Sequence, residues 1–363
     1  FVVAMTSLFE EKKELKTCDL KDALNGNLCR CTGYEPIIKA GIETDANKII
    51  KFNSLYSPER MLADLHEELK TPVYIEFENK KFFKPLDVES CVKFKNDNEK
   101  AVIVSGGTDI SVQMNKGMKN PDIFLYIGGI DSLNEIKVEN KTLVVGAKVS
   151  LIEFEKFAKD LVPDFYKVLK VFGSPQIRNA GTIAGNIANA SPIADTVPFL
   201  FVMNAEIELT GLLGTRKVNI NDFYKGYKIL DLNKDEMITK VFIPLPKADE
   251  KVKLYKISKR KDLDISTFTA AFLIAEKHDI ITNVNIAFGG VGPTVVRLKK
   301  TEEFLKYKDL TEKNLKEAGQ IAKDEITPIS DVRGSKDFRL KLAENIFMKL
   351  YFEYSEKELV SCP

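Results

Sequence analysis

The stretch VFGSPQIRNAGTIAGNIANASPIADTVP (residues 171–198) decides how this chain is interpreted. It shows neither a sustained helical period nor the alternation of a strand, yet short apolar residues run through it. Gly173, Gly181 and Gly185 permit positive φ or close approach of another backbone. Hydrogen-bonding groups are supplied by Asn186, Asn189, Ser191 and Asp195. Two interpretations follow: one wall of a site for a phosphate-bearing cofactor, or a buried coil whose polar groups bind one another.

A second glycine-rich segment lies upstream of this stretch. The β-branched run at residues 101–104 predicts a strand, and Ser105-Gly106-Gly107-Thr108-Asp109 then predicts a turn that opens a helix. Backbone amides at such a turn can hold a phosphate or pyrophosphate. The same residues also occur in ordinary turns. The segment matches neither the Rossmann fingerprint nor a Walker loop.

Composition narrows the class of protein. The 363 residues are 44% hydrophobic and 29% charged, and the net charge of +1 gives no electrostatic case for nucleic acid or an anionic membrane. No apolar run approaches the roughly 18 residues that span a bilayer. The length predicts two or three domains. With His66 and His278 as its two histidines, the chain is a poor candidate for a multi-His metal site or a Ser-His-Asp triad, so we expect a cofactor to supply the chemistry.

Two of the five cysteines lie one residue apart. The others are Cys18, Cys91 and Cys362, an odd set that favours a reducing compartment over a disulfide framework. Cys29 and Cys31 fall on a tight loop between two predicted helices, at residues 19–24 and from Pro36 onward. Two thiolates at this spacing can ligate one iron, whereas the alternative is a pair of cysteines in a turn.

Residues 81–245 alternate β and α, whereas strands precede helices in residues 246–363 and predict an α+β domain there. Residues 1–15 indicate a helix, whereas residues 52–69 lack a clear period and are interpreted as a linker that extends to about residue 78. The aromatic-rich segment at residues 223–227 is interpreted as a turn. In the simpler alternative, it is a loop that packs on the protein surface. Strands are predicted at residues 121–127, 142–147, 205–209, 237–243, 254–260 and 281–288, and helices at 151–158, 301–307, 311–321 and 337–351.

The cysteine loop GNLCRCTGY (residues 26–34) resembles the second cysteine pair of the helical 2Fe-2S domain in the xanthine dehydrogenase family. The resemblance implies that Cys29 and Cys31 are cluster ligands. In that family the other two ligands lie upstream, in a segment that would precede Phe1, as does a ferredoxin-like domain with another cluster. We therefore expect a fragment that lacks its start and two of the four ligands.

Residues 81–352 resemble the flavoproteins of the same molybdenum hydroxylase family, of the xanthine dehydrogenase and carbon monoxide dehydrogenase type. The resemblance rests on several motifs in a fixed order: VSGGTDI (104–110), SPQIRNAGTIAGNIANASPIAD (174–195), FYKGY (223–227), AFGGVGPT (287–294) and ISDVRGS (329–335). It implies the remnant of a helical 2Fe-2S domain at residues 1–50, a linker at 51–80, a two-part, PCMH-type FAD-binding domain at 81–246 and a flavoprotein C-terminal domain at 247–363.

The resemblance also assigns the cofactor site. The segment 102–109 would wrap the FAD pyrophosphate, Phe172 would lie near the flavin, and Tyr227 matches an aromatic residue at the nicotinamide face. The residues implied to bind FAD are Val102, Ile103, Val104, Ser105, Gly106, Gly107, Thr108, Asp109, Phe172, Thr182, Gly185, Asn186, Asp195, Ile238 and Lys256. Thr182, Gly185 and Asn186 would lie against the phosphates and ribityl chain, Asp195 would bind a cofactor hydroxyl, and Ile238 and Lys256 would line the isoalloxazine.

The function implied is that of an electron-transfer subunit most like the small subunit of xanthine dehydrogenases. Electrons would pass from a separate molybdopterin-binding subunit through 2Fe-2S clusters to FAD and then to NAD, within a larger cytoplasmic oligomer. Alternatives are the FAD subunit of an aldehyde, nicotinate or carbon monoxide dehydrogenase, an oxidase that reduces oxygen, or a module that binds no cofactor and serves only in interactions.

Overall fold

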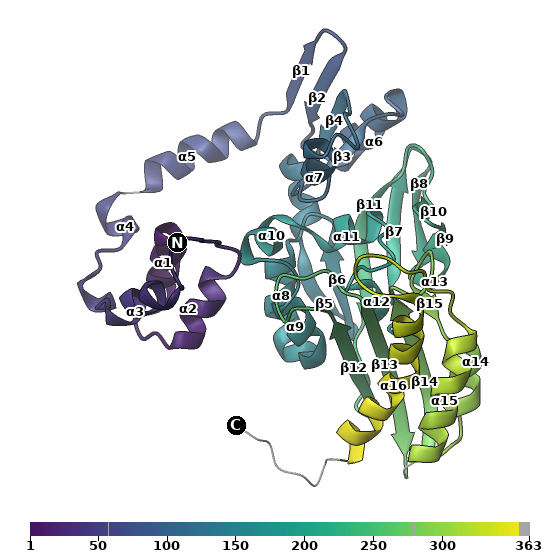
Figure 1. Cartoon of the computed structure of the whole chain (residues 1–363). Coiled ribbons are helices and arrows are strands. Elements are labelled where there is room, and N and C mark those ends of the chain that lie inside the picture. The colour runs from purple at the N-terminus through teal and green to yellow at the C-terminus, as the bar shows by residue number, and fades with distance from the viewer. Residues whose placement is uncertain (57, 279, 356–363) are drawn as a thin grey trace.

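The computed structural model describes residues 1–56, 58–278 and 280–355, which form a small helical lobe and a larger mixed α/β body (Figure 1). Cys362 and the last eight residues of the expected C-terminal domain lie outside the described residues. Across the described ranges, no helix combines the length and the apolar character that a membrane span requires.

The N-terminal lobe consists of α1 (Val2–Glu11), α2 (Thr17–Leu24) and α3 (Glu35–Glu43). Phe9, Leu20 and Leu24 are its buried apolar residues. Helix α3 packs directly on α2, because a Cβ at Gly41 would lie 2.6 Å from a methyl group of Leu20. The three predicted helices are confirmed, and the cysteine loop joins the last two.

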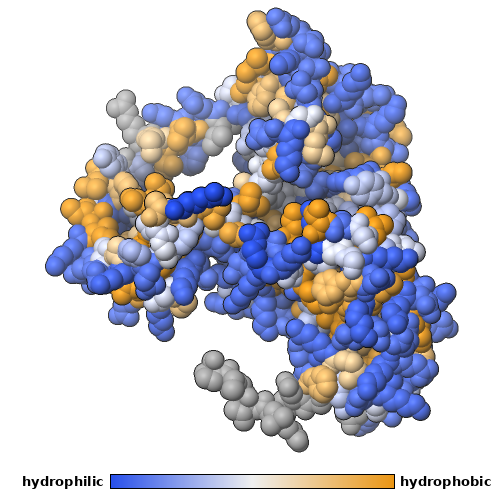
Figure 2. Space-filling view, viewed as in Figure 1, coloured by the Kyte–Doolittle hydropathy of each residue, from blue (hydrophilic) through white to orange (hydrophobic). Residues whose placement is uncertain are grey.

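The segment interpreted as a linker contains α4 (Phe52–Leu55) and α5 (Pro58–Leu69), two helices that the sequence pattern did not predict. Met61, Leu62 and Leu65 do recur at helical spacing, but charged residues between them obscure the period. All three side chains are exposed. Figure 2 shows apolar side chains gathered on this segment and on the N-terminal lobe.

The first sheet has the strand order β1-β2-β4-β3. Its strands are β1 (Val73–Phe77), β2 (Lys80–Lys84), β3 (Val102–Val104) and β4 (Ile123–Tyr126), with β4 parallel to both β2 and β3. Helices α6 (Val88–Asp97) and α7 (Ile110–Asn115) lie on the crossovers that parallel pairing requires. Because β1 pairs with β2 along its whole length, the end of the supposed linker belongs to this sheet. The edge strand β3 leads into the glycine turn.

The second sheet is antiparallel, with the order β5-β6-β11-β7-β8, and a short hairpin of β9 and β10 follows β8. Helices α8 to α12 lie between β6 and β7 in the chain. Three helices of six residues each begin within residues 171–198, where no regular period was predicted. Pro175 and Pro198 lie in the first turns of two of them. The bounds are β5 (Ile136–Glu139), β6 (Thr142–Gly146), α8 (Leu151–Leu161), α9 (Pro163–Lys170), α10 (Pro175–Ala180), α11 (Ile183–Ala188), α12 (Val197–Val202), β7 (Glu206–Gly211), β8 (Gly214–Asn219), α13 (Ile220–Phe223), β9 (Tyr224–Gly226), β10 (Ile229–Leu230) and β11 (Met237–Pro244).

The third sheet has the order β12-β13-β14-β15 and is covered by three helices. Its central strand β13 is buried on both faces, because Phe272 and Ile274 pack with the helices while Ala271 and Leu273 join the core of the second sheet. The predicted order of strands before helices is confirmed. The bounds are β12 (Glu250–Ile257), β13 (Phe268–Lys277), β14 (Ile280–Gly289), β15 (Val296–Arg297), α14 (Lys299–Leu305), α15 (Glu312–Asp324) and α16 (Lys336–Ser355).

Candidate cofactor site

The two glycine-rich segments meet in the structure. A Cβ at Gly106 would overlap the carbonyl group of Ala180, and a Cβ at Gly181 would lie 3.4 Å from the hydroxyl oxygen of Thr108. Gly107 has a φ of +67°, which favours glycine. The turn after β3 therefore lies directly against the end of α10, and residues 102–109 share one site with the stretch at 171–198.

The start of α11 combines an internal hydrogen bond with open space. The Thr182 hydroxyl caps this helix by accepting a hydrogen bond from the Gly185 amide at 3.0 Å, and Thr182 is buried. Gly185 is exposed, and a Cβ there would meet the Thr182 hydroxyl and nothing else described within 4 Å. A cofactor that passes close to the backbone fits this cradle, whereas the Thr182 hydroxyl already serves the helix.

Asp195 forms a buried ion pair between the second and third sheets. Its carboxylate accepts hydrogen bonds from the Lys256 ammonium at 2.5 Å and from the Ser266 hydroxyl at 2.5 Å. The side chains of Asp195 and Lys256 are both less than a tenth exposed. A carboxylate offers about four lone-pair positions, so two remain for a cofactor hydroxyl. The family resemblance implied that both residues bind the cofactor but did not imply that they pair with each other.

Two further predicted residues differ in their surroundings. Asn186 lies on the helix that Thr182 caps, and its side-chain oxygen accepts a hydrogen bond from Thr196 at 2.5 Å. Ile238 is buried in the core of the second sheet, at the bulge where β11 pairs with β7. Its side chain therefore packs inside the protein, close to but not among the exposed residues of the site.

Phe172 is half-buried, and its backbone is held by Arg178, a residue that sequence reasoning did not select. The Arg178 guanidinium donates hydrogen bonds to the carbonyls of Phe172 and Gly173 at 3.1 and 3.2 Å, and it pairs with Glu155 of α8 at 2.9 Å. Both charged side chains are less than a tenth exposed. A lone arginine in a mostly apolar, glycine-containing stretch was the available sequence signal for this role.

Polar contacts join the glycine turn after β3 to the hairpin of β9 and β10. Asn189, at the end of α11, donates a hydrogen bond to Asp109 at 3.2 Å and accepts one from Lys228 at 2.8 Å. Burial lowers the pKa of Lys228, and the negative charge of Asp109 opposes that effect. Tyr227, next to Lys228 in the hairpin turn, is 61% exposed. The predicted nicotinamide contact therefore lies beside the turn after β3, with an accessible ring.

The cysteine loop holds its two thiols together. The sulfur atoms of Cys29 and Cys31 are 2.6 Å apart, and the Tyr34 hydroxyl donates to the Cys29 carbonyl at 2.6 Å. The hydrogen bond with Cys31 lowers the pKa of Cys29 to about 7. Two adjacent thiolates suit one iron of a cluster. Within the described residues no three His, Cys, Asp or Glu side chains gather at a metal-binding distance, so a four-ligand cluster needs further ligands.

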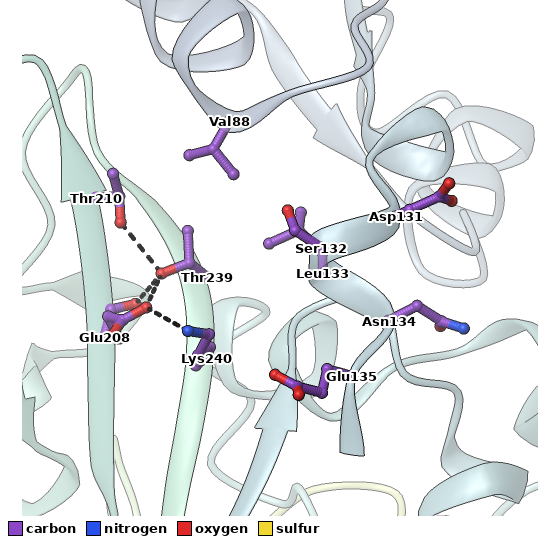
Figure 3. Close-up of a pocket in the computed structure, with 10 residues that line it drawn as sticks. All are labelled: Val88, Asp131, Ser132, Leu133, Asn134, Glu135, Glu208, Thr210, Thr239 and Lys240. Carbon is purple, nitrogen blue, oxygen red and sulfur yellow. Dashed lines mark hydrogen bonds and ion pairs between the residues drawn. The ribbon is translucent and has the colours of Figure 1, made fainter. Parts of the chain in front are cut away.

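A pocket of about 720 Å³ lies elsewhere, between α6, residues 131–135 and the strands β7 and β11 (Figure 3). Thr239 donates a hydrogen bond to Glu208 at 2.8 Å, and Lys240 approaches the same carboxylate at 3.9 Å. None of the cofactor residues predicted from the sequence lines this pocket. Glu208 thus binds two other lining residues, and the lining includes neither Thr182 nor Gly185.

Three family models match the chain. They are the [2Fe-2S] binding domain at residues 1–41, the FAD binding domain in molybdopterin dehydrogenase at 76–246, and the CO dehydrogenase flavoprotein C-terminal domain at 253–354. Together they cover the lobe and all three sheets.

Relatives of several substrate classes are similar to the chain. The xanthine dehydrogenase of Blastobotrys adeninivorans is 32% identical over 87% of this chain and 24% of its own length. The nicotinate dehydrogenase FAD-subunit of Eubacterium barkeri is 30% identical over 69% of this chain and 87% of its own length. The glyceraldehyde dehydrogenase medium chain of Sulfolobus acidocaldarius is 29% identical over 73% and 95%. The chain spans about a quarter to a third of the xanthine dehydrogenases that it matches.

Solved structures agree with the fold. Quinoline 2-oxidoreductase from Pseudomonas putida 86 superposes with a TM-score of 0.71 and 25% identity, over 79% of this chain and 100% of that chain. A Cu,Mo-CO dehydrogenase gives a TM-score of 0.70 at 25% identity, over 74% and 94%. By these matches the chain belongs to the molybdenum hydroxylase family, of which it carries the [2Fe-2S] binding domain, the FAD binding domain and the flavoprotein C-terminal domain.

Proposed function

We propose that the chain is the iron-sulfur and FAD part of a xanthine dehydrogenase-type enzyme, which receives electrons from a molybdopterin-binding partner and delivers them to NAD. The order of the segments is the observation that supports this proposal: a 2Fe-2S match at residues 1–41 precedes the FAD match at 76–246 on one polypeptide. Matches to xanthine dehydrogenases extend over 87 to 98% of this chain. The exposed, paired thiols favour a reducing compartment, and we propose a cytoplasmic complex of several subunits.

FAD, when bound, would supply both hydride and single-electron chemistry. We propose that the amides of residues 105–109 hold its pyrophosphate and that the open side of Gly185 admits the adjoining part of the cofactor. Asp195 would accept a hydrogen bond from a cofactor hydroxyl while Lys256 donates one to the same carboxylate. Phe172 would contact the flavin. The exposed Tyr227 ring would stack on a nicotinamide, and Cys29 and Cys31 would provide two of the four ligands of a cluster.

The first experiment asks whether the chain is an NADH-reactive flavoprotein. The purified protein, expressed with any partner encoded beside it, is assayed for bound FAD and then mixed with NADH without oxygen. We expect a yellow protein whose flavin absorbance is bleached within one turnover. A protein that takes up no FAD would contradict the proposal, and one that holds FAD but reacts with oxygen rather than NADH would be an oxidase subunit.

A nicotinate-type enzyme is the second candidate, because the nicotinate dehydrogenase FAD-subunit is 30% identical to this chain over 87% of its own length. Substrate choice belongs to the molybdenum-containing partner in this proposal. The assembled complex is therefore compared with xanthine, nicotinate and aldehydes as electron donors. Xanthine should give the highest kcat/KM, and preference for another donor by tenfold or more would reassign the enzyme within the family.

A further inference from the structure

The cysteine-bearing lobe contacts the body of the protein next to Phe172. Asp22 of α2 pairs with Lys170, the last residue of α9, at 3.2 Å. A Cβ at Gly26 would lie 2.7 Å from the Ser174 Cβ and closer still to the Gln176 side chain. Figure 1 shows the chain after α2 reaching α10 at this point. The turn that leads to Cys29 therefore rests on the first residues of the 171–198 stretch.

Shape contributes more to this contact than charge does. The side chains of Lys170 and Asp22 are 33% and 64% exposed, and ion pairs of this kind contribute about 0–1 kcal/mol. Gly26 has a φ of +88°, and the space beside it is already filled. Two constraints thus require glycine at position 26: its positive φ and the close approach of Ser174 and Gln176.

The docking segment, residues 171–176, is held from beneath by Arg178. This buried guanidinium donates to the carbonyls of Lys170, Phe172 and Gly173 at 3.1 to 3.3 Å and pairs with Glu155. The segment runs from the end of α9 into the first two residues of α10 and takes part in none of the strand pairings of the described chain. One side chain therefore fixes the curvature of a segment that faces the lobe on one side and carries Phe172 on the other.

We propose that residues 171–176 form the docking surface that holds the cysteine loop at a fixed position relative to Phe172, the proposed flavin contact. Arg178 is the positioning residue of this surface. The inference rests on the proposed function, since Phe172 is a flavin contact only there. The proposal gives residues 171–176 a second role besides flavin contact, because the same rigid segment also contacts the lobe. A displacement of this segment changes both at once.

The contact itself is tested on the unaltered full chain. A zero-length carbodiimide joins a carboxylate directly to an amine in contact with it, so Asp22 and Lys170, which are 3.2 Å apart, should appear as one cross-linked peptide by mass spectrometry. Asp22→Asn should remove that product and no other. Absence of the cross-link in the full chain, with FAD bound, would overturn the docking surface while leaving the flavin proposal intact.

The role of shape is tested with two glycines of the same loop. Gly26→Ala should raise amide hydrogen exchange in residues 171–176 at least tenfold and reduce the cross-link. Gly33→Ala is the matched control, because a Cβ at Gly33 meets nothing within 4 Å. Equal exchange in the two variants would contradict the proposal.

Arg178 is tested with Arg178→Lys, which keeps a positive charge but has a single nitrogen in place of the separate Nη1, which binds the three carbonyls, and Nε, which faces Glu155. Exchange should rise tenfold or more in residues 171–176, and the Asp22 to Lys170 cross-link should fall. Wild-type exchange and cross-linking in this variant would show that Arg178 does not position the segment. If the protein bound no FAD but kept the cross-link, the proposed function would fail and the docking surface would stand.

Discussion

Gly106 and Gly185 are both glycines of the candidate site, but the structure gives them different reasons to be glycine. The space beside Gly106 holds the backbone of Ala180, whereas the space beside Gly185 holds only the Thr182 hydroxyl, at 3.0 Å. The first glycine serves the fold, since two segments meet there. The second leaves room that the protein itself does not fill.

We therefore expect Gly106→Ala to damage both folding and FAD binding, and Gly185→Ala to damage FAD binding alone. The first should lower the free energy of unfolding by about 2–4 kcal/mol, because a backbone has to move. The second should change it by less than about 1 kcal/mol and weaken FAD at least tenfold. Urea unfolding and FAD titration measure the two effects. A Gly185→Ala protein with wild-type affinity for FAD would show that the cofactor does not bind on this side of α11.

Asp195→Asn tests the buried ion pair. Removing one charge leaves the Lys256 ammonium buried without its counter-ion, which costs about 3–5 kcal/mol in comparable pairs. We expect urea unfolding to show a loss of this size. The double variant Asp195→Asn, Lys256→Met should recover part of it, because no unpaired charge remains. If both proteins lost the same stability, the contribution of the pair would be packing and not charge.

At the scale of elements, Arg216 joins β8 to the start of β11. Its guanidinium forms two hydrogen bonds with the Glu236 carboxylate, at 2.6 and 2.8 Å, and a third with the Asp231 carbonyl at 3.0 Å. The hydrogen bond from Arg216 lowers the pKa of Glu236 from its ordinary value of 4.5. The stabilisation from this pair is therefore complete above about pH 4.5 and disappears as pH falls through the lower, folded-state value.

Glu236→Gln should consequently destabilise the protein by about 1–2 kcal/mol at pH 7, with the difference from wild type shrinking below about pH 4.5. Thermal or urea unfolding across pH 3 to 8 measures this. Lys234 is a control position in the same turn, since its ion pair with Glu99 is exposed, and Lys234→Gln should have little effect at any pH. A pH-independent loss in Glu236→Gln would mean that the carboxylate contributes by shape alone.

Sequence patterns predicted elements better than they predicted contacts between elements. The strand before Ser105 and the helix after Pro36 follow from local rules, and both are present. Helix α5 was not predicted because its apolar residues are few, so the sequence shows no clear helical period there. The apolar side chains remain exposed in the structure. The pairing of Asp195 with Lys256, 61 residues away, depends on how the third sheet meets α12, which no local pattern encodes. The role of Arg178 was not predicted because this residue binds backbone carbonyls, which no pattern of side chains in the sequence reveals.

At the scale of the whole molecule, the segment of α4 and α5 connects the lobe to the first sheet with little packing of its own. Leu55, Met61, Leu62 and Leu65 are all 45% or more exposed. We expect limited proteolysis to cut within residues 58–72 before it cuts any sheet, because this segment has few buried apolar contacts. Mass spectrometry of the early products locates the cut. First cleavage inside the second or third sheet would contradict the structure.

This connector also has a consequence for the strength of docking. A short tether gives the lobe an effective concentration of the order of millimolar at residues 171–176. A contact made by one exposed ion pair and one close glycine then stays formed within a single chain, although the same surfaces would separate if diluted as two proteins. A family member that keeps its cluster domain on another polypeptide has no such tether, and must replace the lost avidity with a larger interface.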